Sequence, residues 1–299
     1  MSRPTTAAIT ALFLTGICLG SLTISEAAAG QYAKISDDLD LYYEEAGQGA
    51  PMVLVPGWTA SGVVFSRQLE HFSQSHRVVV YDPRSQGLST RTLDHNDYTQ
   101  HGRDLAALMD KLGLKHVILV AWSAGCFDGY SYVRSQGTDN LAAFVCIDMP
   151  PRGMSAQPGD WAFSGASEED IGNIRGQLDA LANNRRGLSQ AMAKGMNGRE
   201  LSPDETNWFV RQAMLAPTYA MLLLRLDITF SDYRAEAKLL DSKVPVLDVI
   251  SEPNAAVALP WIKTNTPHAE TFTIKRHMSF WSEPESFNAG LDAFLKKVH

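Results

Sequence analysis

The stretch His116-Val117-Ile118-Leu119-Val120-Ala121-Trp122-Ser123-Ala124-Gly125 decides the fold that the sequence predicts. Residues 116–120 are an apolar run typical of a buried strand, and residues 126–134 have a helical pattern. A strand, a small-x-Ser-x-small sequence and a helix, in this order, are typical of a nucleophile elbow. Such a sharp turn lifts the serine hydroxyl away from the sheet. Ala121 stands where glycine is usual, which is the mildest replacement, so we predict Ser123 as a nucleophile.

Apolar runs alternate with helical patterns on both sides of this stretch. Strands are expected at 31–35, 39–44, 52–55, 77–81, 116–120, 142–147, 244–250 and 271–274. Helices are expected at 62–72, 98–112, 126–134 and 283–298. The first two strands form a hairpin, and the later alternation favours parallel pairing. We therefore predict an α/β protein whose eight-stranded, mostly parallel sheet carries helices on both faces.

The alternation is interrupted after Pro150-Pro151. Residues 151–240 contain no strand pattern and have helical stretches at 168–182, 187–198 and 203–226. We predict that this segment is a helical cap, and that residues 30–150 and 241–299 form the core. The cap helices contain four methionines, which suit either plain helix packing or an adaptable apolar pocket: Met192, Met196, Met214 and Met221.

The first 29 residues have the pattern of a secretory signal peptide. Arg3 is followed by an apolar, small-residue stretch at 7–22, and Ala27-Ala28-Ala29 offers a cleavage site. The apolar stretch is shorter than a spanning helix requires, so no stable membrane anchor is expected. The protein is predicted to be secreted or periplasmic.

Charge and cysteine content narrow the range of functions. The formal net charge is −7 and no basic cluster occurs, which argues against binding to nucleic acid or anionic membranes. Of the three cysteines, Cys18 lies in the signal peptide, and Cys126 and Cys146 remain. They suit either two buried thiols or a disulfide, and the sequence leaves this open. The sequence has no metal-binding signature, and no metal or cofactor is predicted.

A serine hydroxyl needs a base within hydrogen-bonding reach and a third group that orients the base. His277 is the best-placed base, because it directly follows the last predicted strand. The other histidines lie in polar loops, on helix surfaces, at a strand start or at the C-terminus. Ser123 and His277 then have the order nucleophile before histidine, as in one class of hydrolases.

Several motifs together resemble the α/β-hydrolase fold superfamily over nearly all of 31–299. Residues 54–58, Leu-Val-Pro-Gly-Trp, resemble its oxyanion loop, and residues 81–89 resemble its Asp-x-Arg-Gly-x-Gly-x-Ser loop. Residues 104–123 match its helix, strand and elbow, and 277–287 match its pattern around the histidine in outline. The resemblance implies an α/β-hydrolase fold and assigns the backbone N–H groups of Trp58 and Ala124 as oxyanion donors.

The acid of the triad is the unusual feature of this sequence. The superfamily usually has an aspartate after the strand that corresponds to 244–250, but this chain has Asn254 there. Some members carry the acid one strand earlier, which corresponds to Asp148. Asp148 is therefore the predicted orienting acid, and Glu252 is the alternative acid. Asp248, in mid-strand, is expected to be structural.

These residues favour a secreted serine hydrolase that cleaves an apolar carboxylic ester or lactone. One alternative is a cofactor-independent dioxygenase of the same fold. The oxyanion loop of such dioxygenases begins with Pro-Gly-Trp, which Pro56-Gly57-Trp58 resembles. Such dioxygenases tend to have a histidine shortly after this tryptophan, whereas this chain has Thr59-Ala60-Ser61-Gly62. A second alternative is a non-catalytic member that binds an apolar ligand, because fold alone does not establish activity. The oligomeric state is left open.

Overall fold

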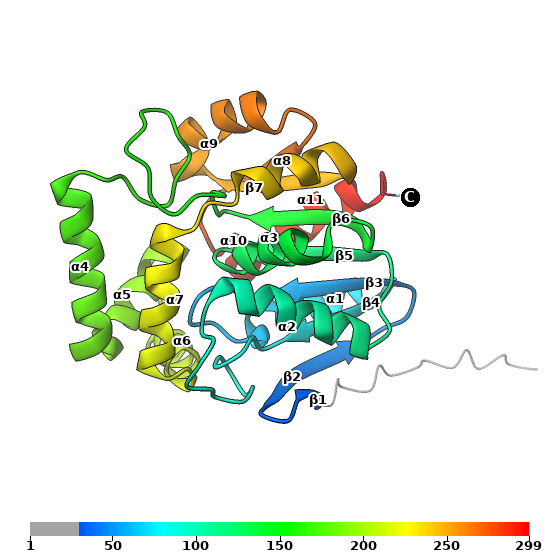
Figure 1. Ribbon diagram of the computed structural model, residues 1–299, viewed down its shortest axis with the longest axis horizontal. Helices are drawn as coiled ribbons and strands as arrows, with labels where there is room; N and C mark the ends of the chain where they lie inside the picture. Colours follow the sequence, from blue (N-terminus) through cyan, green and yellow to red (C-terminus); the bar gives the residue numbers. More distant parts are fainter. Residues whose placement is uncertain (1–29, 299) are drawn as a thin grey trace, which may run out of the picture.

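A computed structural model describes residues 30–298 of the chain (Figure 1). The predicted signal peptide lies outside the described residues. Eight strands form one sheet: β1 (Gln31–Ser36), β2 (Leu39–Ala46), β3 (Ala50–Val55), β4 (His76–Tyr81), β5 (Val117–Trp122), β6 (Leu141–Ile147), β7 (Val246–Ser251) and β8 (Glu270–Ile274).

The sheet has the strand order β1-β2-β4-β3-β5-β6-β7-β8. β2 pairs antiparallel with β1 and β4, and all other pairs are parallel. The prediction of a mostly parallel eight-stranded sheet is confirmed. The central position of β5 follows from its sequence, because all six of its residues are buried and apolar.

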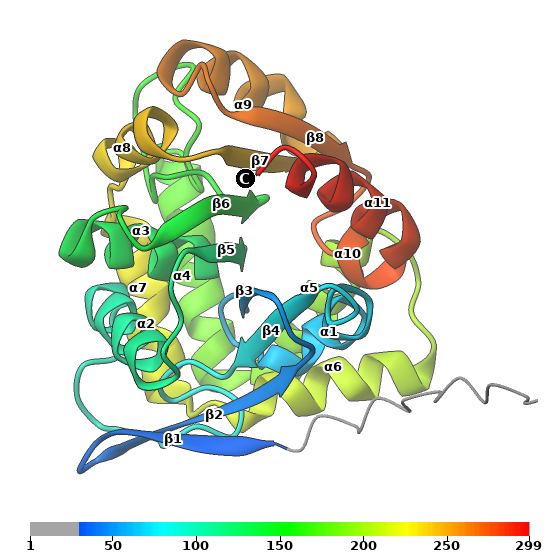
Figure 2. The ribbon, with the colours of Figure 1, turned by 90° about the vertical axis from the view of Figure 1, so that its right-hand side faces the viewer.

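Helices cover both faces of the sheet (Figure 2). One face carries α2 (Tyr98–Lys111), α3 (Gly125–Gln136) and α8 (Arg234–Lys243). The other carries α1 (Ser66–Phe72), which follows the 3₁₀ turn η1 (Gly62–Phe65), and α10 (Ser279–Ser282) and α11 (Pro284–Leu295). Alternate residues of β5 enter the two cores, since Leu119 packs with the first group and Val120 with the second.

Four helices between β6 and β7 lie beside the sheet: α4 (Glu168–Asn183), α5 (Arg185–Asn197), α6 (Pro203–Leu215) and α7 (Thr218–Phe230) (Figure 1). The predicted single helix over 203–226 is wrong, because α6 and α7 are bent by 89° at Ala216-Pro217. Proline disfavours the helical conformation in the residue before it, and Ala216 is extended. α8 spans the predicted boundary at residue 240 and is joined to α3 by an Arg134–Glu236 ion pair of 2.7 Å.

The segment after β7 is a helix, α9 (Glu252–Asn265), which contains Asn254 in its first turn. It begins directly after the strand, with Pro253 in its first turn, where proline is favourable. Within residues 30–298, no single helix is long and apolar enough to cross a membrane. The bent pair of α6 and α7 passes that test only when both helices are counted together.

Candidate active site

Ser123 lies in the sharp turn between β5 and α3. Its φ angle is +55°, a left-handed conformation that costs free energy for a residue other than glycine. Close packing around the turn requires small neighbours. A Cβ atom on Gly57 would lie 2.8 Å from the Ser123 Cβ, and one on Gly125 would lie 2.6 Å from the Pro56 carbonyl oxygen. These contacts explain why glycine occupies both positions.

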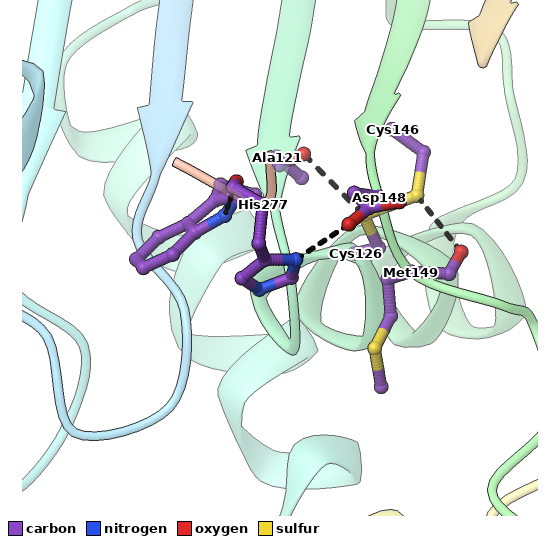
Figure 3. The surroundings of a disulfide bond; sticks show 7 residues. Ala121, Cys126, Cys146, Asp148, Met149 and His277 are labelled. Carbon is purple, nitrogen blue, oxygen red and sulfur yellow. Dashed lines mark hydrogen bonds and ion pairs between the residues drawn. A yellow bond between two sulfur atoms is a disulfide. The ribbon is translucent and has the colours of Figure 1, made fainter. Parts of the chain in front are cut away.

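Asp148 and His277 are joined by a hydrogen bond across 129 positions of sequence. The His277 Nδ1 lies 2.7 Å from the Asp148 Oδ2, and the ring points toward the carboxylate in Figure 3. Asp148 follows β6 with a φ of +55°, and its backbone N–H donates to the Val249 carbonyl of β7 at 2.7 Å. His277 lies between β8 and α10, where its carbonyl accepts from the Trp122 indole at 3.0 Å. The backbones of both Asp148 and His277 are therefore hydrogen-bonded to neighbouring strands, which fixes the positions from which the two side chains extend.

The Asp148 carboxylate is buried and accepts two further hydrogen bonds. Its Oδ1 accepts from the Ser251 backbone N–H at 2.8 Å and from the Asn254 side-chain amide at 2.9 Å. Burial raises the pKa of Asp148, but the hydrogen bond and charge of His277, followed by these two donors, hold it below its ordinary value. Asp148 is therefore ionised at neutral pH, as a residue that orients an imidazole and stabilises its protonated form must be.

Within residues 30–298, neither the alternative acid Glu252 nor the mid-strand Asp248 forms a hydrogen bond or ion pair with His277. Glu252 is the exposed first residue of α9 and is not part of the lining around Ser123. Asp248 is buried in the middle of β7, and burial, followed by the charge of Asp241, raises its pKa to about 7. Of the predicted acid Asp148 and the alternative acid Glu252, the structure brings Asp148 to the histidine.

Ser123, His277 and Asp148 line one pocket, together with Trp58 and Ala124. In the described part of the chain, no direct hydrogen bond joins the Ser123 and His277 side chains; such contacts are often long without substrate. The N–H groups of Trp58 and Ala124 donate no hydrogen bond within residues 30–298. Since Ala124 also caps the N-terminus of α3, its amide is available to a negatively charged oxygen.

A disulfide joins the helix that follows Ser123 to the strand that precedes Asp148 (Figure 3). Cys126, in the first turn of α3, is bonded to Cys146 near the end of β6, with a Cα–Cα separation of 5.6 Å. That separation is typical of a disulfide. The crosslink lies three residues after Ser123 and two residues before Asp148. Of the two options that the sequence left open, the structure has the disulfide.

The pocket has a volume of about 410 Å³, which suits a small organic ligand. Its walls are mostly apolar and include Trp58, Trp122, Trp161, Met192 and Met196. Two other cap methionines differ: Met221 is buried and Met214 is exposed. Trp281 stacks on Trp208, with ring centroids 5.8 Å apart. Within residues 30–298, no group of three or more His, Cys, Asp or Glu side chains is placed to share a metal ion.

Comparison with known proteins agrees with this architecture. A family model described as the alpha/beta hydrolase fold matches residues 50–166. The crystal structure of a bromoperoxidase from Bacillus anthracis superposes with a TM-score of 0.80 at 24% identity, over 90% of this chain and 100% of that one. The chain has the α/β-hydrolase fold.

The relatives of this α/β-hydrolase differ in activity. A non-heme chloroperoxidase from Kitasatospora aureofaciens is 33% identical over 116 residues, which are 38% of this chain and 42% of the chloroperoxidase. The chain therefore matches about two fifths of that relative. A bifunctional esterase/perhydrolase from Acinetobacter calcoaceticus is 25% identical over 286 residues, 89% of this chain and 99% of the relative. Esterases, haloperoxidases and other hydrolases of this fold are thus the known relatives.

Two polar residues near the site were missed by sequence reasoning. Asn254 was interpreted only as the loss of an acid, whereas its amide donates to Asp148. No local sequence signal indicates this contact, because Asn254 and Asp148 are 106 positions apart in the sequence. Arg225 lines the pocket although it lies in an otherwise apolar stretch of α7. An arginine within an apolar helical stretch was the available signal for a polar group in the pocket, and the helical periodicity alone did not indicate it.

Proposed function

We propose that this α/β-hydrolase is a serine hydrolase that cleaves carboxylic esters or lactones. The observation that carries the proposal is the Asp148–His277 hydrogen bond, at 2.7 Å, in the pocket that contains Ser123. An ionised, buried carboxylate fixes the tautomer of the imidazole and leaves its Nε2 free to accept a proton. Of the relatives named above, the bifunctional esterase/perhydrolase supports a hydrolase.

The reaction takes place in two halves. The Ser123 hydroxyl attacks the acyl carbon and transfers its proton to His277, while the amides of Trp58 and Ala124 donate to the developing oxyanion. His277 returns the proton to the departing alcohol oxygen, leaving an acyl-enzyme. Water then attacks the acyl carbon, gives a proton to His277, and the acid is released as Ser123 takes the proton back. With a lactone, the alcohol stays attached to the product.

The decisive experiment is labelling with a fluorophosphonate, because only an activated serine reacts with it. Modification should map to Ser123 by mass spectrometry and be absent in Ser123→Ala. The same substitution should abolish hydrolysis of 4-nitrophenyl butyrate without changing the melting temperature. Full esterase activity in the folded Ser123→Ala variant would refute the mechanism. Oxygen uptake with a heteroaromatic substrate and no labelling would instead support the dioxygenase.

We also propose that the protein is exported, on the basis of the N-terminal pattern described above. An oxidising compartment is where a structural disulfide such as Cys126–Cys146 persists. Expression of the full chain in a bacterial host, followed by N-terminal sequencing of the periplasmic fraction, tests this. Export predicts a mature N-terminus at Gly30, whereas an intact Met1 in the cytoplasm would refute it.

A further inference from the structure

Arg225 is a buried cation in the wall of the active-site pocket. Arg225 lies on α7 and is only 2% exposed to solvent. It lines the same pocket as Ser123 and His277. Arginine stays protonated in proteins, so its positive charge remains there even in apolar surroundings. Burial lowers its pKa, and no carboxylate of residues 30–298 opposes that effect.

The groups that hold Arg225 are all neutral. Its Nε donates to the Gln177 Oε1 at 3.0 Å, and its Nη1 donates to the Thr229 Oγ1 at 2.6 Å. The Phe163 ring lies 5.1 Å from the Cζ atom, a cation–π contact. Within residues 30–298, Arg225 forms no ion pair, and its Nη2 donates no hydrogen bond.

Another buried arginine of the same chain shows what is missing. Arg84 donates two hydrogen bonds to Asp104, at 2.7 and 2.9 Å, and both side chains are less than 8% exposed. A buried guanidinium is favourable when a carboxylate engages it in this bidentate way, and costly when its charge is uncompensated. Gln177 and Thr229 fix the orientation of Arg225, but within residues 30–298 it has no carboxylate partner like the one that Asp104 provides to Arg84.

We propose that Arg225 binds a free carboxylate on the substrate, so that the preferred ester is one that also carries a carboxylate group. This inference rests on the proposed function and narrows its substrate class. The remaining N–H groups of the guanidinium pair with the substrate carboxylate while Ser123 attacks the ester carbonyl elsewhere in the same pocket. The apolar walls then contact the carbon chain between the two groups.

Matched ester pairs test the proposal. Mono-4-nitrophenyl adipate carries the carboxylate on the acyl side, and 4-nitrophenyl hexanoate is its neutral counterpart. The second pair, 4-acetoxybenzoate and its methyl ester, carries the charge on the alcohol side. The measured quantity is the ratio of kcat/KM for the anionic and neutral ester in each pair, with rates in Ser123→Ala subtracted as background. Wild type should favour the anion in at least one pair.

Arg225→Gln should lower that ratio by about 10- to 100-fold, the range for a lost charged hydrogen-bonding partner. Arg225→Lys should retain part of it. The control is Arg185→Gln, since Arg185 is a cap arginine outside the pocket lining that contacts Thr218 and Ala213. A structural role for Arg225 would lower the melting temperature and both rates equally, leaving the ratio unchanged. Unchanged ratios in both pairs would overturn the proposal.

A binding measurement separates this proposal from the proposed function. Calorimetric titration with adipate and with 1,6-hexanediol requires no turnover. Tighter binding of adipate to wild type, lost in Arg225→Gln, supports the anion site even if no ester is cleaved and no fluorophosphonate reacts. If adipate binds equally to wild type and to Arg225→Gln, and esterase activity is normal, the anion site is refuted and the hydrolase proposal remains intact.

Discussion

Loss of the Cys126–Cys146 disulfide should destabilise the protein by about 3 kcal/mol. The two cysteines are 20 residues apart in sequence. Closing a loop of that length removes about 11 cal/mol/K of entropy from the unfolded chain, which corresponds to about 3 kcal/mol at 25 °C. That is a large fraction of the 5–15 kcal/mol that typically stabilises a folded domain.

The corresponding shift in melting temperature follows from the size of the domain. An unfolding entropy of about 2.1 cal/mol/K per residue, over about 270 residues, gives about 0.6 kcal/mol/K. The Cys126→Ala/Cys146→Ala variant should therefore melt about 5 °C below the wild type. Differential scanning calorimetry measures the shift, and mass spectrometry with a thiol-reactive label verifies the state of the sulfurs.

Reduced wild type is the matched control, because it keeps both sulfur atoms and so separates crosslinking from packing. Both cysteines are buried, so reduction requires unfolding and refolding with a thiol reagent. Reduced wild type should melt close to the double variant. If fully reduced protein melts within 1 °C of the oxidised protein, the argument from loop entropy fails.

Three further predictions concern acidic groups and their partners. Asp148→Asn should lower kcat by about 10³–10⁴-fold, because an amide cannot stabilise the charged His277 ring; steady-state kinetics at a known concentration of folded protein measures it. Asn254→Ala should lower kcat by only about 10-fold, since the backbone donor to the carboxylate remains, and an equal loss in both variants would contradict this. Asp248 has a folded-state pKa of about 7, above its unfolded value of about 3.9, so it stabilises the fold fully below that unfolded value and loses this contribution as the pH rises through 7. Urea unfolding at pH 5 and pH 8 should show Asp248→Asn gaining stability relative to wild type at the higher pH.

The sheet could be predicted because its signals are local and strong. Each core strand is a short run of buried apolar residues, and the helices between them have their own periodicity. The prediction of one helix over 203–226 was wrong, although the sequence contains the reason. Pro217 disfavours the helical conformation at Ala216, so the helix ends there. The prediction relied on the long apolar stretch and did not include the restriction that proline places on the residue before it. In the structure, Ala216 is extended, as that restriction requires.

The sequence by itself determined the elbow at Ser123, because strand, turn and helix are contiguous and the turn needs only small neighbours. It also named Asp148 and His277 as candidates. Only the tertiary structure decided that these two side chains meet, that Asn254 donates to the acid, and that Arg225 is buried without a counterion among residues 30–298. The physical reason is distance along the chain: local sequence sets backbone conformation, but the packing of separate strands and helices sets which side chains share a pocket and which charges lose their water.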